Sequence, residues 1–199
     1  IVFSNDPYKR ARDANEKKRQ KRNPDKNEQI EEWRIEWREK GVIQFAEEVL
    51  VCPPDVPEHP SIGAVPEFVI LAEDQKQFLS DIARHQDDPE RVKRFILAAG
   101  RGAGKTFILA VYVAWRMIRF DNFTMTVMGG SGEQSEKIKE YIDFWRMRDD
   151  RIFFILHRSV QSGNRPARVE SRWNSYSRFP ACSDSSARGP HVTQLLIDE

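Results

Sequence analysis

The sequence predicts an α/β fold with a mostly parallel central sheet and a helical appendage on its N-terminal side. Two observations carry this prediction. A short apolar run, Phe95 to Ala98, precedes a glycine-rich turn and then an apolar, helix-forming stretch from Phe107 to Ile118. Later, the β-forming run Phe123 to Met128 precedes the helix-forming stretch Glu133 to Met147. Strands that alternate with helices in this way are typical of a parallel sheet.

The glycine-rich turn contains the residue types that a phosphate-binding loop requires. Its residues are, in order, Gly100, Arg101, Gly102, Ala103, Gly104, Lys105 and Thr106. Glycines allow backbone N–H groups to close around phosphate oxygens, and the following helix N-terminus adds partial positive charge. We expect Lys105 to reach the β- and γ-phosphates of ATP, and the hydroxyl of Thr106 to ligate Mg²⁺. The central domain is therefore predicted to be a P-loop NTPase domain.

One position departs from the usual G-x-x-x-x-G-K-[ST] pattern. Ala99 stands where the pattern has glycine, and Gly100 follows it, so the turn is expected to shift by one residue. The alternative interpretation is a glycine-rich connection between a strand and a helix that binds nothing. The flanking apolar strand and helix favour the phosphate loop, because they are the context that the motif requires.

Composition limits the class of protein. The 199 residues suffice for one domain with a core and an appendage, and a net charge of +1 with 32% charged residues describes a globular protein without by itself implying nucleic acid. The longest apolar run, Phe107 to Trp115, is too short to span a bilayer, and the first residues do not resemble a signal peptide. Cys52 and Cys182 form no C-x-x-C pair, so two reduced thiols in an intracellular protein are expected.

The N-terminal part is expected to form an appendage, residues 1–60, ahead of the ATPase domain, residues 61–199. A basic run from Lys9 to Arg22 is either an arm for nucleic acid or localisation, or a solvated tail without aromatic residues to stack on bases. The pattern is helical from Asp25 to Val51, with Asp25 expected as the N-cap and a break at Gly41. Prolines then mark a linker.

The stretch before the phosphate loop is expected to contain one more helix, Leu71 to Arg84. Gln75 lies just ahead of its apolar stripe. Its amide can both donate to and accept from the adenine edge, as in several motor ATPases that place a glutamine at this distance. A surface glutamine with no ligand is the other interpretation, and both stay open.

The last part of the chain is predicted to contain further strands. Three short candidates are Ile152 to Leu156, Ala167 to Ser171 and Trp173 to Phe179. An apolar strand then ends on Asp198 and Glu199. Asp198 is expected to hold the Mg²⁺ shell opposite Thr106, and Glu199 to orient or deprotonate the attacking water. The alternative is a strand whose acidic end simply meets solvent.

Three segments together carry a resemblance to a known family. They are Gln75-x-x-Phe-Leu79, the arginine-bearing loop Ala98-Ala-Gly-Arg-Gly-Ala-Gly-Lys-Thr106, and Ser186-Ala-Arg-Gly-Pro-His191 leading into Leu195-Leu-Ile-Asp-Glu199. From about residue 45 to 199 the chain resembles the ATPase domain of the large terminase subunit, the DNA-packaging motor of tailed viruses.

The resemblance implies a role for each matching residue. Gln75 would sense adenine, Gly100 to Thr106 would hold the phosphates with Arg101 as a mobile arginine, and Asp198 and Glu199 would be the metal-binding and catalytic acids. Arg188, in a polar loop, would be an arginine finger that acts on a neighbouring subunit's ATP, with a local surface contact as the alternative. Family members also carry a coupling motif and a nuclease domain after the acids. Neither lies within these 199 residues, so DNA cleavage is not assigned.

The resemblance also implies partners and a place of action. It implies double-stranded DNA, a viral portal and a small terminase subunit, a homo-oligomeric ring, and work in the host cytoplasm at the procapsid portal. The function predicted from the sequence is therefore an ATP hydrolase that uses ATP and Mg²⁺ to translocate double-stranded DNA into a procapsid. The alternatives are a helicase-like DNA translocase and a nucleotide-binding module without turnover.

Overall fold

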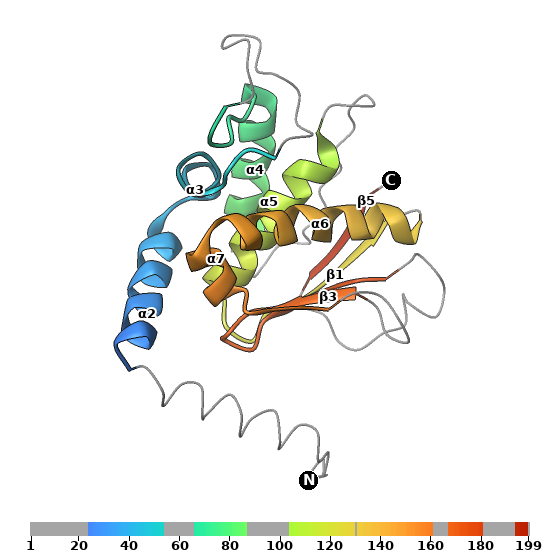
Figure 1. The fold of residues 1–199 in the computed structure, drawn as a ribbon. Coiled ribbons are helices and arrows are strands. Elements are labelled where there is room, and N and C mark those ends of the chain that lie inside the picture. Colours follow the sequence, from blue (N-terminus) through green and yellow to red (C-terminus); the bar gives the residue numbers. More distant parts are fainter. Residues whose placement is uncertain are drawn as a thin grey trace, which may run out of the picture.

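The structure is a computed structural model, and it describes residues 24–53, 66–86, 104–129, 131–160, 167–180 and 194–198. These segments form helices and strands in alternating groups (Figure 1). In chain order they are α2 (Pro24–Glu39), α3 (Val42–Val49), α4 (Glu73–Gln86), α5 (Lys105–Arg119), β1 (Thr124–Gly129), α6 (Gly132–Arg148), α7 (Asp150–Ile155), β2 (Arg158–Val160), β3 (Ala167–Glu170), β4 (Tyr176–Phe179) and β5 (Gln194–Asp198).

The described strands form one sheet in the order β2-β3-β4-β1-β5. β1 pairs in parallel with both β4 and β5, whereas β2 with β3 and β3 with β4 are antiparallel. The α/β class is confirmed, but this sheet is mixed rather than mostly parallel. The reason is local: residues 171–175 join β3 to β4, and so short a connection can only link antiparallel neighbours. The predicted strand at 95–98 lies outside the described residues.

Helices cover one face of the sheet, where α5, α6 and α7 lie together in Figure 1. Alternate residues of β3 and β4 point into this layer, and Val169 and Ser177 among them are fully buried. The hydroxyl of Ser135, near the start of α6, donates to the carbonyls of Phe179 and Pro180 at the end of β4. These contacts fix the start of α6 against the carboxyl end of the parallel strands.

Helix α5 is the centre of the core. All residues from 107 to 118 are buried, which is expected of a helix that is enclosed on every side. Helices α2, α3 and α4 pack on it from one side, and α6 and the sheet from the other. Phe107, in its first turns, makes edge-to-face contacts with Tyr141 and Trp145 of α6, with ring centroids 5.4 and 6.0 Å apart.

The N-terminal helix α2 packs on the same core. Ile30 and Trp37 are buried and Trp33 is half-buried, as their shared helical face predicts. The expected N-cap was wrong, however. α2 begins at Pro24, whose fixed φ angle suits the first helical position, and Asp25 lies inside the first turn. The predicted boundary at residue 60 falls outside the described segments and stays a prediction.

Two of the short strand predictions need correction. Residues 152–156 were expected to be a strand, but Asp150–Ile155 form helix α7. Asp149 starts this helix, because its carboxylate accepts from the backbone N–H of Arg151 at 2.7 Å. Short apolar runs fit either structure by periodicity alone. The strand expected from Trp173 begins only at Tyr176, since Asn174 adopts a left-handed turn conformation with φ 62°.

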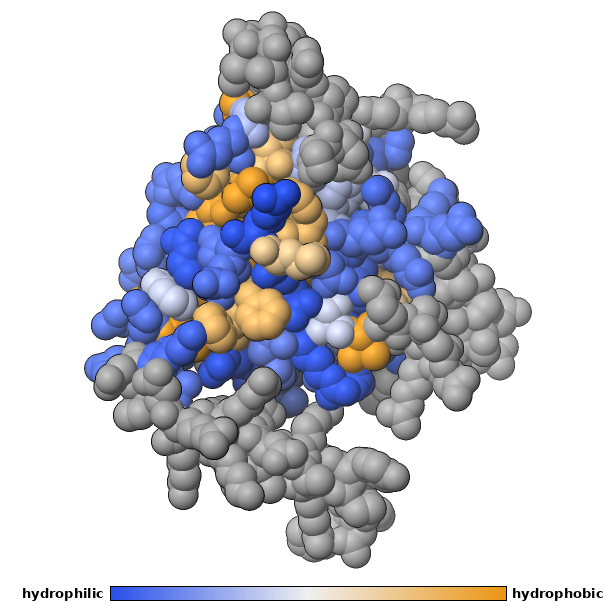
Figure 2. All heavy atoms as spheres, in the orientation of Figure 1, coloured by the Kyte–Doolittle hydropathy of each residue, from blue (hydrophilic) through white to orange (hydrophobic). Residues whose placement is uncertain are grey.

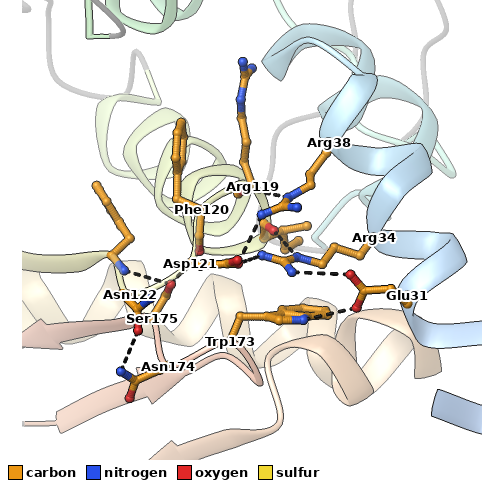
Figure 3. Close-up of polar contacts among 12 residues, drawn as sticks. Glu31, Arg34, Arg38, Arg119, Phe120, Asp121, Asn122, Trp173, Asn174 and Ser175 are labelled. Carbon is orange, nitrogen blue, oxygen red and sulfur yellow. Dashed lines mark hydrogen bonds and ion pairs between the residues drawn. The ribbon is translucent and has the colours of Figure 1, made fainter. Parts of the chain in front are cut away.

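The C-terminal end of α5 is held by two arginines of α2 (Figure 3). The Nε of Arg34 donates to the carbonyl of Ile118 at 3.1 Å, and the Nε of Arg38 donates to the carbonyl of Arg119 at 2.7 Å. Both guanidinium groups also pair with Asp121, just after the helix. Arginines at this end complement the partial negative charge of the helix C-terminus.

Arg34 is the central residue of this network. Its guanidinium carbon lies 3.6 Å from the ring centroid of Trp173, whose indole N–H donates to Glu31 at 3.1 Å (Figure 3). Its side chain is 2% exposed, so the charge is desolvated and sandwiched between an aromatic ring and α5. Residues more than 80 positions apart in sequence are thereby joined.

The surface seen in Figure 2 is mostly hydrophilic, with apolar side chains in small groups. None of the helices in the described segments is long and apolar enough to cross a membrane. Cys52 is buried and forms no disulfide within the described segments, while Cys182 and the basic run from Lys9 to Arg22 lie outside those segments.

Candidate functional site

Helix α5 begins at a glycine in a left-handed conformation. Gly104 has φ 75° and ψ 20°, which is readily adopted only by glycine. It is the N-cap of α5 and has no side chain to satisfy the first N–H groups of the helix, and its carbonyl accepts from the N–H of Ile108 at 2.9 Å. Lys105 and Thr106 follow as the first two helical residues and are half-buried. The start of α5 therefore depends on a glycine at position 104.

The side chain of Gln75 lies against this glycine. A Cβ atom at Gly104 would be 3.0 Å from Nε2 of Gln75. The other amide atom, Oε1, accepts from the backbone N–H of Ala72 at 3.0 Å, at the start of α4. Gln75 thus touches the start of α5 with one end of its amide and closes the start of its own helix with the other. Two helices that are separated in sequence have their N-termini at the same place.

Ion pairs and apolar packing fix α4 in this position. Lys76 pairs with Glu47 of α3 at 3.1 Å, and the same carboxylate accepts from the N–H of Leu71 at 3.2 Å. The hydrogen bond to Glu47 raises the pKa of Lys76, which stays charged at neutral pH. Leu79 and Ile82 are buried beneath α4. Gln75 is therefore carried on a docked helix rather than on a loop.

The acidic end of β5 lies at one edge of the sheet together with the end of β1. In the parallel register Gly129, the last residue of β1, is the partner of Asp198, the last residue of β5. A Cβ at Gly129 would lie 2.6 Å from Cβ of Gln134 and 2.7 Å from the N atom of Ser135. Only glycine allows α6 to start this close to the strand end.

The connection from α5 to β1 brings the start of α5 toward the same edge. Residues 120–123 are too few to carry the chain back along the helix, so β1 runs opposite to α5. The start of α5 then lies toward the edge at which β1 and β5 end. Figure 1 shows α5 beginning on the side of the molecule where β5, in red, reaches the C-terminus.

A contact between α5 and β5 was not anticipated from the sequence. The amide Nε2 of Gln194 donates to the hydroxyl of Tyr112 at 3.0 Å, and both groups are buried. This bond fixes the first residue of β5 to the middle of α5. The available signals were a tyrosine inside an otherwise apolar helix and a glutamine at the start of an apolar strand, because buried polar groups need partners.

The predicted site residues fall into two groups. Gln75, Gly104, Lys105 and Thr106 are brought together, and the backbone of Asp198 ends β5 at the sheet edge described above. The remaining predicted residues lie outside the described segments, and so their positions stay predictions. They are Gly100, Arg101, Gly102, Ala103, Arg188 and Glu199.

Comparison with solved structures gives a match to the crystal structure of the HK97 bacteriophage large terminase, with a TM-score of 0.56. The fold is terminase-like. Sequence identity is 15%, and the alignment covers 79% of this chain and 37% of the terminase. The chain thus spans little more than a third of that protein's length, and the likeness concerns the fold. No protein-family model and no curated protein sequence matches the chain.

Proposed function

We propose that this chain is the ATPase region of a large terminase subunit, which hydrolyses ATP to move double-stranded DNA into a procapsid. The observation that carries the proposal is the placement of Gln75 against Gly104, beside Lys105 and Thr106. The sequence suggested each of these as a nucleotide contact separately. Their meeting at one helix start, in a terminase-like fold, supports a common role.

The residues at the start of α5 suit a nucleoside triphosphate. Lys105 is the first residue of the helix, where its ammonium group would pair with β- and γ-phosphate oxygens. Backbone N–H groups of residues 100–104 would surround the phosphates, with Arg101 as an additional cation in the same loop. Gln75 would bind the adenine edge through its amide.

The oxygen ligands on the two sides of the site suit Mg²⁺. The hydroxyl of Thr106 and the carboxylate of Asp198 are of the hard, oxygen-donor type that this ion prefers, together with water and phosphate oxygens. Bound Mg²⁺ would neutralise charge on the β- and γ-phosphates. In this proposal the chain's own residues supply positioning and electrostatic stabilisation rather than covalent chemistry.

Two further residues complete the proposed reaction. Glu199, directly after the strand that ends on Asp198, would orient the attacking water and accept its proton. Arg188 would contribute charge to the ATP of a neighbouring subunit in a ring assembled on the viral portal. Double-stranded DNA, the portal and a small terminase subunit are the proposed partners. The match to a large terminase favours this role over a helicase-like translocase.

The catalytic assignment is tested by Glu199→Gln. This change keeps the shape of the side chain but removes the base, so phosphate release is expected to fall by about 10²–10⁴-fold while ATP still binds within about twofold of the wild-type affinity. Steady-state phosphate release in the presence of DNA, with nucleotide titration alongside, measures both.

A matched control is Glu133→Gln. Glu133 is an exposed residue in the first turn of α6, and the same isosteric change there is expected to leave turnover unaltered. Phosphate release by Glu199→Gln at the wild-type rate would show that the base lies elsewhere.

A further inference from the structure

The sheet carries a row of arginines on the face that is turned away from the helices. Arg158 of β2 is the register partner of Glu170, and Arg168 of β3 is the register partner of Arg178 on β4. Because side chains alternate along a strand, all four residues point away from the helix layer into which Val169 points. We refer to Arg158, Arg168 and Arg178 as the arginine face.

The charges on this face are not balanced. Glu170 forms ion pairs with two of the arginines, Arg168 at 2.7 Å and Arg158 at 3.5 Å. Arg178 donates to the hydroxyl of Thr126 at 3.2 Å, and its Nε is buried with no hydrogen-bond partner. In the part of the chain that the structure describes, Arg178 pairs with no carboxylate. On this face, two guanidinium groups therefore share Glu170, and the third pairs with no carboxylate among the described residues.

Two features of this face oppose folding: Arg168 lies opposite Arg178, and the Nε of Arg178 is buried without a partner. Like charges directly opposite on neighbouring strands repel each other, and a buried donor without a partner costs free energy. The side chains of Arg158 and Arg168 are 40% and 28% exposed, so an external group can reach them. An anion that binds across the exposed guanidinium groups would offset the repulsion.

We propose that the arginine face binds the phosphodiester backbone of DNA. Arginine's planar fork matches phosphate oxygens, and adjacent strands about 4.8 Å apart place three such forks within roughly 10 Å. Tyr176 adds a hydroxyl group on the same face, which suits a further contact to phosphate or sugar. Backbone contacts carry no sequence information, as a protein that moves along DNA needs. The choice of DNA as the ligand rests on the proposed packaging role.

The test is the salt dependence of DNA binding by the full chain without nucleotide, measured by fluorescence anisotropy with a labelled duplex. Arg168→Ala combined with Arg178→Ala is expected to reduce the magnitude of the slope of log affinity against log salt by about 1.8, because each lost phosphate contact contributes about 0.9. Affinity at 0.1 M salt should fall about tenfold or more. A single strand of the same length shows whether the backbone contact needs a duplex.

The matched control removes two positive charges elsewhere. Arg84→Ala with Lys137→Ala takes them from exposed positions on α4 and α6, and should leave the slope unchanged. Arg168→Lys with Arg178→Lys keeps the charges and should retain most of the slope. Arg158→Ala, at a more exposed position, should lower the slope by about 0.9 and guards against misfolding of the double variant.

A folded double variant with an unchanged slope would overturn the proposal. So would a variant that loses thermal stability while its DNA affinity stays the same, since the arginines would then stabilise the sheet rather than bind DNA. Because no nucleotide is present in the assay, either result would leave the ATP site untouched.

Discussion

The two ends of helix α5 are built in opposite ways. At the C-terminal end, side chains from other elements satisfy successive carbonyls: Arg34 donates to Ile118, Arg38 to Arg119, and the hydroxyl of Ser175 to Phe120 at 2.6 Å. At the N-terminal end the cap is Gly104, which has no side chain. One end of the helix is capped by side chains from other elements, and at the other end we propose that an anion binds.

Under the proposed function, the two ends of this helix serve different purposes. Every helix leaves unsatisfied groups at both ends, and a fold optimised only for stability would cap both with side chains. Here three side chains from other elements donate to carbonyls at the end remote from the candidate site. Burial lowers the pKa of Arg34 to about 10, so the residue remains charged at neutral pH and keeps its bonds. We expect substitutions at the two ends to affect different properties.

The largest effect is expected from Arg34→Ala. This variant removes a buried guanidinium that packs on Trp173 and pairs with Asp121, so the free energy of unfolding should fall by about 2–4 kcal/mol. Urea denaturation measures the loss. ATP affinity of the folded protein should stay within about twofold, because the proposed nucleotide site lies at the other end of α5.

The control is Arg38→Ala. The Arg38 side chain is 35% exposed, so its loss should cost about 1 kcal/mol or less. Equal losses for both arginines would show that burial of Arg34 is not what holds α2 to α5.

A smaller effect is expected from Gly104→Ala, at the other end of the helix. The left-handed backbone and a Cβ only 3.0 Å from Nε2 of Gln75 should reduce stability by about 1–2 kcal/mol. ATP affinity should fall as well, since both the loop and Gln75 must shift. Nucleotide titration and urea denaturation of the same variant test the two parts.

Gly41→Ala is the matched glycine control. Gly41 has φ −62°, and a Cβ there would meet nothing within 4 Å. The Gly41→Ala variant should therefore bind ATP with the affinity of the wild type. Loss of affinity in Gly41→Ala but not in Gly104→Ala would contradict the placement of the site.

Sequence patterns predicted those helices and strands that are specified by the residues within them. Hydrophobic periodicity gave α4, α5 and α6, and a β-forming run gave β1, because these signals lie within the segments themselves. The predicted strand at 152–156 failed for the opposite reason. A short apolar run fits a helix or a strand, and the cap at Asp149 decided between them.

Long-range partners could not be predicted. Nothing in the sequence near Arg34 indicates a bond to Ile118, because the pairing depends on how α2 crosses α5. The same holds for the antiparallel half of the sheet and for the bond between Tyr112 and Gln194. For the candidate site, the sequence supplied Gln75 and the start of α5 as separate candidates. Their contact follows from the docking of α4 on α3, which no local pattern encodes.

The most direct test of the central claim is the ATP affinity of Lys105→Ala, measured by titration calorimetry together with its free energy of unfolding. Charge-assisted bonds of the expected kind contribute roughly 1.5–3 kcal/mol, so affinity should fall by about tenfold or more. Stability should change by no more than about 0.5 kcal/mol, since alanine is a good residue for the first turn of a helix. Unchanged ATP affinity in this folded variant would contradict the claim that the start of α5 binds nucleotide.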